Sequence, residues 1–172
     1  MIVLMGESAS GKSTIENELV KLGYDKIISY TTRPGRSSEN DGKDYHFLTE
    51  EAFEYNKQDG FFAEHVTYRG WHYGIAKDDC TNDAVVVVEP SGLRQLKKMK
   101  NLNITSFYLK CTERERLIRM AKRGDEIMEI VKRIFSDQGV FQGIESEVTH
   151  IIDSNRKIQE ILFDITNTLE NK

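Results

Sequence analysis

The amino-acid sequence predicts an α/β fold with a parallel central sheet covered by helices on both faces. Two five-residue runs, MIVLM at residues 1–5 and AVVVV at residues 84–88, are apolar throughout, which is typical of strands buried on both faces. Segments with helical spacing alternate with the expected strands, as they do where helices connect parallel strands. Two further segments are candidate strands: residues 105–109 and 148–152. The 172 residues of the chain fit one compact domain.

Helices are expected from apolar spacing and from capping residues. Three apolar side chains share one helical stripe ahead of Gly23, which can end that helix: Ile15, Leu19 and Leu22. Thr112 and Glu115 have the spacing of a capping box, and the helix that follows carries Leu117 and Met120. The C-terminal segment predicts a helix that packs on the core through five side chains: Ile158, Ile161, Leu162, Ile165 and Leu169.

Two segments interrupt this alternation and are expected to form movable flaps. The first, residues 30–77, contains GFFAEHVTYRGWHYGI, whose aromatic residues and glycine turn predict an antiparallel hairpin. The second, residues 119–140, is dense in arginine and lysine and has one helical stripe of apolar residues: Ile127, Ile130, Val131 and Ile134. The core then comprises residues 1–29, 78–118 and 141–172.

Composition excludes several classes of function. A net charge of −4 argues against sequence-independent nucleic-acid binding, which needs a basic face. The longest apolar runs have five residues and no signal peptide is expected, so we predict a cytoplasmic protein that does not span a membrane. Cys80 and Cys111 are expected to be free thiols, and the four histidines have no metal-ligand spacing. The sequence does not predict an oligomeric state.

The segment GESASGKS, residues 6–13, matches the phosphate-binding P-loop pattern GxxxxGK[ST]. An apolar strand precedes it and an amphipathic helix follows, so successive backbone N–H groups and a helix N-terminus can surround phosphate oxygens. Lys12 is expected to reach the β- and γ-phosphates of ATP, and the Ser13 hydroxyl to ligate Mg²⁺. The segment supplies these expected ATP contacts: Gly6, Glu7, Ser8, Ala9, Ser10, Gly11, Lys12, Ser13 and Thr14. The predicted fold is that of a P-loop NTPase.

The segment SYTTRPGRSSENDGKDYHF, residues 29–47, is too polar to be buried for its own stability. Arg33 and Arg36 lie three residues apart in it, and guanidinium groups bind a phosphate dianion through paired hydrogen bonds. The phenol of Tyr45 can donate to the same phosphate. A solvated surface loop with scattered charges is the alternative interpretation.

From GESASGKST through this loop to GFFAEHVTYRGWHYG, the chain resembles guanylate kinases, P-loop enzymes that transfer the γ-phosphoryl group of ATP to GMP. The resemblance weakens after about residue 80. It implies ATP and GMP as substrates, Mg²⁺ as cofactor, a small antiparallel GMP-binding subdomain at residues 30–77 and a helical lid that closes over ATP. It also implies four contacts to the GMP phosphate: Arg33, Arg36, Tyr45 and Tyr73. Ser29 and Glu64 would read guanine.

Base chemistry supports the role of Glu64 independently. Guanine presents N1–H and its 2-amino group as adjacent donors, which one carboxylate accepts together, whereas adenine has an unprotonated N1. A site built on such hydrogen bonds rejects the mismatched base strongly. As an isolated residue, Glu64 would be interpreted as an ordinary surface glutamate.

In the second flap, RMAKRG and VKRI place Arg119, Arg123 and Arg133 where the family has arginines that contact phosphates. Phosphoryl transfer needs charge stabilisation more than covalent chemistry. The resemblance therefore implies four catalytic residues: Lys12, Arg33, Arg123 and Arg133. Arg119 and Arg123 would contact ATP. An exposed basic helix face is the alternative.

Several residues depart from the family pattern. Pro34 directly follows Arg33, Ile75 stands where a serine or threonine commonly contacts guanine, and Asp153 replaces an asparagine near the adenine. Val87 stands where the family has the first acidic residue of this strand. Glu89 is then the expected carboxylate beside GMP and around the water shell of Mg²⁺.

Two other functions fit parts of the pattern. A kinase of another small phosphate ester, such as ribose 1,5-bisphosphate, would share the YGI sequence at residues 73–75. Glu64 and Tyr45 argue against it, because a ribose phosphate has no amidine edge. A non-catalytic guanylate-kinase-like binding module would have little use for the intact P-loop. The sequence therefore predicts phosphorylation of GMP, with dGMP as a further candidate acceptor.

Overall fold

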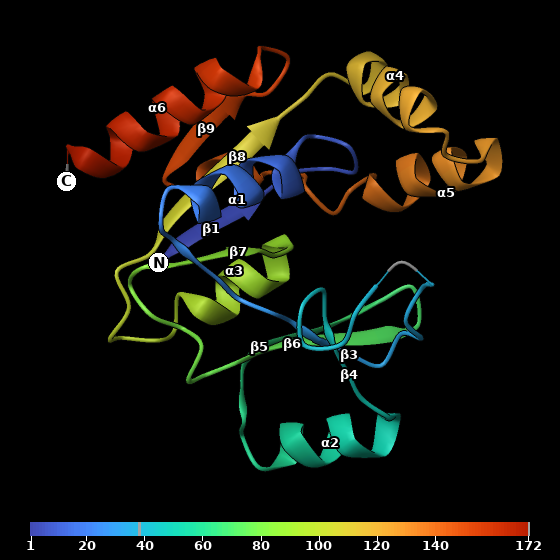
Figure 1. Ribbon diagram of the computed structural model, residues 1–172, viewed down its shortest axis with the longest axis vertical. Coiled ribbons are helices and arrows are strands. Elements are labelled where there is room, and N and C mark those ends of the chain that lie inside the picture. The colour runs from blue at the N-terminus through green and yellow to red at the C-terminus, as the bar shows by residue number, and fades with distance from the viewer. Residues whose placement is uncertain (38, 172) are drawn as a thin grey trace.

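The larger sheet of the molecule is parallel and lies at its centre. The computed structural model describes residues 1–37 and 39–171, and these form two sheets (Figure 1). The larger sheet has the strand order β2 (Asp25–Lys26), β7 (Ala84–Val87), β1 (Ile2–Met5), β8 (Thr105–Lys110) and β9 (His150–Asp153). All neighbouring strands in it are parallel. The predicted α/β fold with a parallel central sheet is confirmed.

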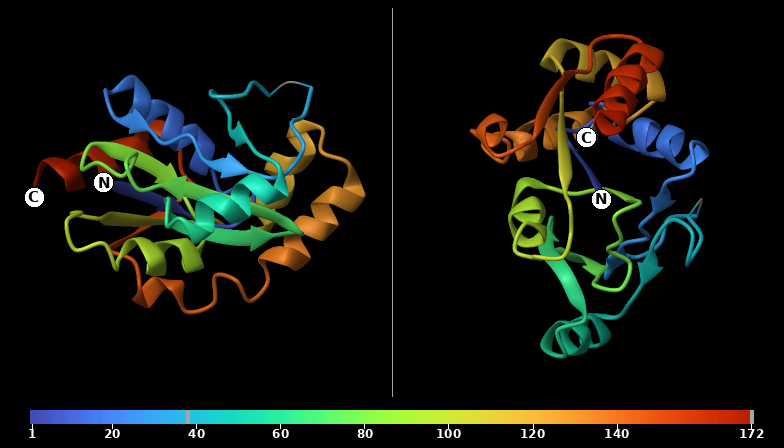
Figure 2. Two further views of the ribbon diagram at one scale, coloured as in Figure 1. Left: turned by 90° about the horizontal axis from the view of Figure 1, so that it is seen from below. Right: turned by 90° about the vertical axis from the view of Figure 1, so that its left-hand side faces the viewer.

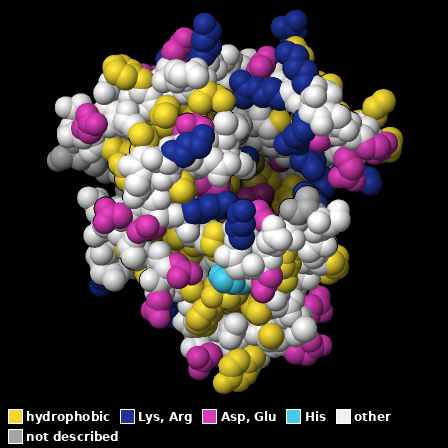
Figure 3. Space-filling model, viewed as in Figure 1, with side chains coloured by type: hydrophobic (Ala, Val, Ile, Leu, Met, Phe, Trp, Pro, Cys, Tyr) yellow, Lys and Arg dark blue, Asp and Glu magenta, His cyan; other side chains and the backbone are white. Residues whose placement is uncertain are grey.

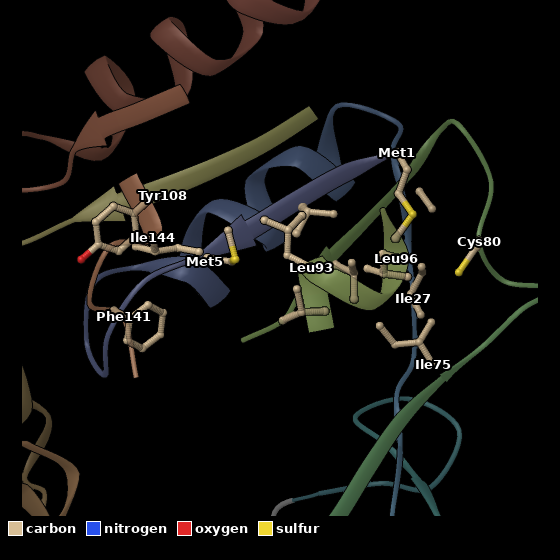
Figure 4. Packing of buried hydrophobic residues seen from close by; sticks show 14 residues of the cluster. Met1, Met5, Ile27, Ile75, Cys80, Leu93, Leu96, Tyr108, Phe141 and Ile144 are labelled. Atoms are coloured by element: carbon tan, nitrogen blue, oxygen red, sulfur yellow. The ribbon is translucent and has the colours of Figure 1, made fainter. Parts of the chain in front are cut away.

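Helices cover both faces of this sheet. Ile2 and Leu4 of β1 pack with side chains of α1 (Lys12–Lys21) and α6 (Ile158–Glu170). Val3 and Met5 point to the other face, where they pack with α3 (Pro90–Leu96), as Figure 4 shows for Met5, Leu93 and Leu96. Every residue of β1 is buried, which explains why its sequence is apolar at each position.

The first flap contains the second sheet, which is mixed. Its strand order is β4 (His46–Phe47), β3 (Tyr30–Thr31), β6 (Trp71–Ala76) and β5 (Phe62–Tyr68), and α2 (Glu50–Gln58) lies beneath it in Figure 1. β5 and β6 form the expected antiparallel hairpin. The expectation of a wholly antiparallel sheet is wrong, because β3 and β4 pair in parallel after a long connecting loop.

The segment predicted as the second flap, residues 119–140, contains the end of α4 (Glu113–Arg123) and all of α5 (Ile127–Asp137), and a 3₁₀ turn (Ile144–Ser146) follows it. Figures 1 and 2 show both helices beyond the carboxyl ends of the parallel strands. Two side-chain contacts join α5 to the tip of the β5–β6 hairpin: Arg69 to Glu129 at 3.4 Å and Tyr68 to Ser136 at 3.3 Å. The two flaps therefore meet above the strand ends.

Some local expectations are wrong. Leu22 is 57% exposed because α1 ends at Lys21, so the next residue leaves the buried stripe. Ile127 is 75% exposed, and α5 turns part of its apolar stripe to solvent. Residue 148 lies outside β9, since Val148 packs against the core cluster while Thr149 pairs with Ser106.

The predicted capping box at the start of α4 forms only in part. The Thr112 hydroxyl accepts the backbone N–H of Glu115 at 3.4 Å. The Glu115 carboxylate instead binds Arg119, and the N–H of Thr112 donates to Asn155. Leu117 on this helix is 38% exposed, whereas Met120 is buried as expected.

The described residues bear on two further expectations. No helix in residues 1–37 and 39–171 combines the length and apolar character that crossing a membrane requires. Cys80 and Cys111 are both buried and free, as predicted.

Candidate functional site

The P-loop connects β1 to α1 in a tight turn. Gly6 has φ 152°, and a Cβ there would lie 2.5 Å from Ser10 Oγ and 2.7 Å from Leu109 O, so only glycine fits. The Lys12 ammonium donates to Gly6 O at 2.7 Å and to Glu7 O at 2.9 Å. Burial lowers the pKa of Lys12 to about 8, although the charge of Asp137 opposes the shift. The Lys12 ammonium is therefore held against the backbone of the P-loop.

A cleft of about 560 Å³ lies between the P-loop, the second sheet and the α4–α5 pair. In Figure 3 the surface is hollowed here, and lysine and arginine side chains surround the hollow. The cleft brings together most of the residues that the sequence predicted: Gly6, Ser8, Ala9, Lys12, Ser13, Arg33, Arg36, Tyr45, Glu64, Tyr73, Glu89, Arg123 and Arg133. These come from segments that are far apart in the sequence.

The other predicted residues lie around this cleft. A cavity of about 370 Å³, which shares Lys12 and Ser13 with the cleft, is lined by three of them: Gly11, Thr14 and Arg119. Ser10 is fully buried behind the loop. Glu7 lines a groove on another side of the loop, and Ser29 lines a separate cavity of about 600 Å³ together with Tyr45. The structure thus does not bring Ser29 and Glu64 into one pocket.

One end of the cleft gathers hydrogen-bond donors of the kind that bind anions. The Arg33 guanidinium forms a double hydrogen bond with Glu39, at 2.8 and 2.9 Å, and lies 5.3 Å from the centre of the Tyr45 ring. The Tyr45 and Tyr73 rings are 6.1 Å apart. Burial, and next Tyr73, raise the pKa of Tyr45, so its phenol stays protonated and can donate. Arginine and phenol donors therefore converge, with Glu39 fixing the arginine.

A different part of the cleft contains a buried acceptor. Glu64 on β5 is only 4% exposed, and its Oε2 has no hydrogen-bond partner among the described residues. Burial, and next the charge of Glu89, raise the pKa of Glu64 to about 7. Burial and the charge of Asp137 also raise the pKa of Glu89. A buried carboxylate oxygen without a donor is costly, so this one is positioned for a donor from a ligand.

The flap arginines are held by a carboxylate and by backbone. Asp125 binds Arg123 Nε at 2.8 Å and lies 3.8 Å from Arg133. Arg123 is the first cause of the lowered pKa of Asp125. Arg119 instead donates to two backbone carbonyl groups. These are Ser10 O in the P-loop, at 3.3 Å, and Ser154 O, at 2.6 Å. Two of the three arginines thus face the cleft, and the third braces the P-loop.

Asp137, at the end of α5, is a site residue that the sequence did not predict. Its carboxylate accepts the backbone N–H of Ser8 at 2.8 Å, the Ser8 hydroxyl at 3.2 Å and Arg116 Nη1 at 2.9 Å. Both charged partners are buried, with 8% exposure for Asp137 and 6% for Arg116. One carboxylate therefore joins the P-loop to both α4 and α5.

Comparison with known proteins decides the family. A family model described as guanylate kinase matches residues 1–172. The chain belongs to the guanylate kinase family. It is 27% identical to a guanylate kinase of Alkalilimnicola ehrlichii, over 96% of this chain and 83% of that one. It is 34% identical to a guanylate kinase of Onion yellows phytoplasma, over 78% of this chain and 68% of that one.

The fold agrees with that of a solved guanylate kinase. The crystal structure of guanylate kinase from Anaplasma phagocytophilum matches with a TM-score of 0.75 and 23% identity, over 99% of this chain and 84% of that chain. The expected P-loop NTPase fold is confirmed.

The departures from the guanylate kinase pattern lie in different surroundings. Ile75 is 1% exposed and belongs to the core cluster that contains Leu93 and Leu96, so it is part of the hydrophobic core. Val87 lines the cleft. Asp153 is exposed and accepts the N–H of Asn155 at 2.9 Å. Of Ile75, Val87 and Asp153, only Val87 lines the cleft.

Proposed function

We propose that three groups of residues in this cleft bind different parts of the two substrates. As a member of the guanylate kinase family, the protein transfers the γ-phosphoryl group of ATP to GMP, forming ADP and GDP. Glu64 and Glu89 face guanine, the anion-binding end at Arg33 holds the GMP phosphate, and the P-loop holds ATP. The observation that carries this assignment is the buried, unpartnered Oε2 of Glu64 in the same cleft as Lys12.

Guanine supplies the hydrogen-bond donors that Glu64 Oε2 lacks. Its N1–H and 2-amino group are adjacent donors that a carboxylate can accept together. Because Glu64 Oε2 is buried without a donor, such a base offsets an existing desolvation cost, whereas adenine would place a lone pair there. A ribose phosphate has no matching pair of N–H groups. Residues 30–77, which contain the Glu64 strand and the Arg33 loop, would then be the GMP-binding subdomain.

Charge stabilisation is the catalytic contribution that we assign to this chain. Lys12 would neutralise the transferring phosphate from one side, and Arg123 and Arg133 from the other, with residues 119–140 as the lid. Arg33 would hold the acceptor phosphate in line. No general base is required, because the attacking oxygen belongs to a phosphate that is already ionised.

The donors near Ser13 fit Mg²⁺. Mg²⁺ prefers oxygen ligands and usually keeps several waters, with few ligands from the protein itself. Ser13 and Glu89 line the cleft beside Lys12, and the described residues contain no group of three or more acidic, histidine or cysteine side chains for a protein-only metal cage. Ser13 would ligate the ion and Glu89 would bind its waters. The bound ion would supply additional charge neutralisation at the ATP phosphates.

Replacing Glu64 tests the assignment. Glu64→Ala should lower kcat/KM for GMP, because both guanine donors lose a charged acceptor. The decrease should correspond to about 2 to 4 kcal/mol of lost transition-state stabilisation. AMP, which lacks those donors, should be affected far less, and the preference for GMP over IMP should narrow because IMP lacks the 2-amino group. Steady-state kinetics with all three nucleotides measures this. Glu51→Ala, an exposed change on α2, is the control. Unchanged GMP turnover in Glu64→Ala would exclude base reading by Glu64.

The raised pKa of Glu64 predicts a pH-dependent base preference. Its ionised form accepts both guanine donors, and its pKa is about 7. The preference for GMP over IMP should therefore be complete near pH 8 and decline as the pH falls through 7. The ratio of the two kcat/KM values isolates this effect, since both substrates carry the same phosphate. Glu64→Gln should give a ratio independent of pH; a wild-type ratio that is flat from pH 5.5 to 8 would refute the prediction.

A further inference from the structure

Gly92 lies in the first turn of α3, directly behind the Glu64 carboxylate. A Cβ built at Gly92 would lie 2.9 Å from Glu64 Oε2, 3.3 Å from Glu64 Cδ and 3.1 Å from Val88 Cβ. Distances this short leave no room for a methyl group without movement of a neighbour. The backbone of Gly92 has no left-handed conformation that would require glycine. Glycine in a helix is normally less favourable than alanine, so the reason for glycine here is the space that Glu64 occupies.

The separation between α3 and β5 is fixed by a second contact. One turn after Gly92, the Gln95 side chain accepts the N–H of His65 at 3.1 Å and donates to His65 O at 2.9 Å. His65 follows Glu64 directly in β5. This double hydrogen bond holds the strand against the helix at the position of the carboxylate. The helix therefore cannot move away from Glu64 without breaking both bonds.

No hydrogen bond to a described residue positions Glu64 Oε2, so packing does. Oε2 lies at the edge of the space that a side chain at residue 92 would fill, so the missing Cβ of Gly92 leaves room for it. We propose that Gly92 is a specificity-determining position, which sets how far the Glu64 carboxylate reaches into the cleft. This inference rests on the proposed guanine contact of Glu64. A side chain at residue 92 would push the carboxylate toward the base and misalign it with the two guanine donors.

Gly92→Ala tests this role without a large change in folding. The atom that the added methyl group would contact most closely is the far end of a flexible side chain, which can move, and alanine suits a helix better than glycine. We expect little change in the melting temperature and an unchanged KM for ATP. The kcat/KM for GMP should fall by about 10- to 100-fold, since misplacing a binding group by about 1 Å can cost that much. The preference for GMP over IMP should narrow.

Two further variants separate the possible causes of a lower kcat/KM for GMP in Gly92→Ala. Ser91→Ala changes an exposed neighbour in the same helical turn and should leave all these values unchanged. Gly92→Ala combined with Val88→Gly removes the second close contact, which is with the Val88 Cβ, but keeps the one with Glu64, so the GMP defect should persist. Full recovery of GMP turnover in the double variant would assign the effect to Val88 and overturn the proposal.

The wild type and Glu64→Ala distinguish this inference from the proposed function. If wild type prefers GMP over IMP and Glu64→Ala abolishes that preference, but Gly92→Ala retains it, only the inference about Gly92 is wrong. If wild type shows no such preference, base reading by Glu64 is itself wrong. An equal loss of activity with GMP and IMP in Gly92→Ala, together with a lower melting temperature, would show a purely structural role and also overturn the proposal.

Discussion

Lys12→Ala should lower kcat by about 10²- to 10³-fold, the loss typical for one preorganised group that stabilises charge in a transition state. The ammonium lies at the P-loop and lines the cleft with Arg33, Arg123 and Arg133. Its removal should leave the fold intact, because the lowered pKa of Lys12 shows that burial disfavours its charge in the folded protein. Initial rates with saturating ATP and GMP, together with thermal melting, measure both expectations.

The matched control for this variant is Lys21→Ala. Lys21 lies in the last turn of the same helix, where it pairs with Glu18 on the surface. Its replacement should alter neither kcat nor the melting curve appreciably. Activity of Lys12→Ala within about tenfold of wild type would contradict the assignment of this loop as the site of the transferring phosphate.

Asp137→Ala should destabilise the protein by about 3 to 5 kcal/mol, because it leaves the Arg116 guanidinium buried without its charged partner. The same change removes the acceptor for the Ser8 N–H in the P-loop. For a chain of this size the melting temperature should fall by roughly 6 to 20 °C. Urea denaturation gives the free energy of unfolding directly.

A double variant separates the buried charge from other losses. Arg116→Met with Asp137→Asn removes both charges and keeps an acceptor near Ser8, so it should recover much of the stability lost in Asp137→Ala. Glu147→Ala, which breaks the exposed pair with Arg94, should have little effect. A loss below about 1 kcal/mol in Asp137→Ala would show that the Arg116–Asp137 pair behaves like a surface ion pair.

The parts of the fold that the sequence predicted are those with local signals. β1 is apolar at every position because both its faces are covered, and the β5–β6 hairpin joins neighbours in sequence. The parallel pairing of β3 with β4 carries no such signal, since the 14 residues 32–45 separate the two strands. Leu22 shows that apolar spacing alone does not locate the end of a helix. The residue continues the apolar spacing of α1, but the helix has already ended at Lys21.

The candidate site also contains residues that local sequence motifs predict and residues that no motif marks. The P-loop and the arginine loop are continuous motifs, and most of their residues line one cleft. Asp137 was missed because its partner Ser8 lies 129 residues away and no pattern links the two positions. Glu39 and Asp125 were missed because, within polar segments, their charges resemble those of any solvated loop. A sequence pattern identifies the groups that meet a ligand more readily than those that position them.

The identity of the acceptor tests the central claim most directly. ADP release by wild-type protein with ATP and Mg²⁺ should be measured for GMP, dGMP, IMP, AMP and ribose 1,5-bisphosphate at equal concentrations. Because Glu64 and the Arg33 loop line one cleft with the P-loop, kcat/KM should be highest for a guanine nucleotide, lower for IMP and lowest for AMP and the ribose phosphate. A higher kcat/KM for ribose 1,5-bisphosphate than for GMP, or equal values for GMP and AMP, would contradict the account.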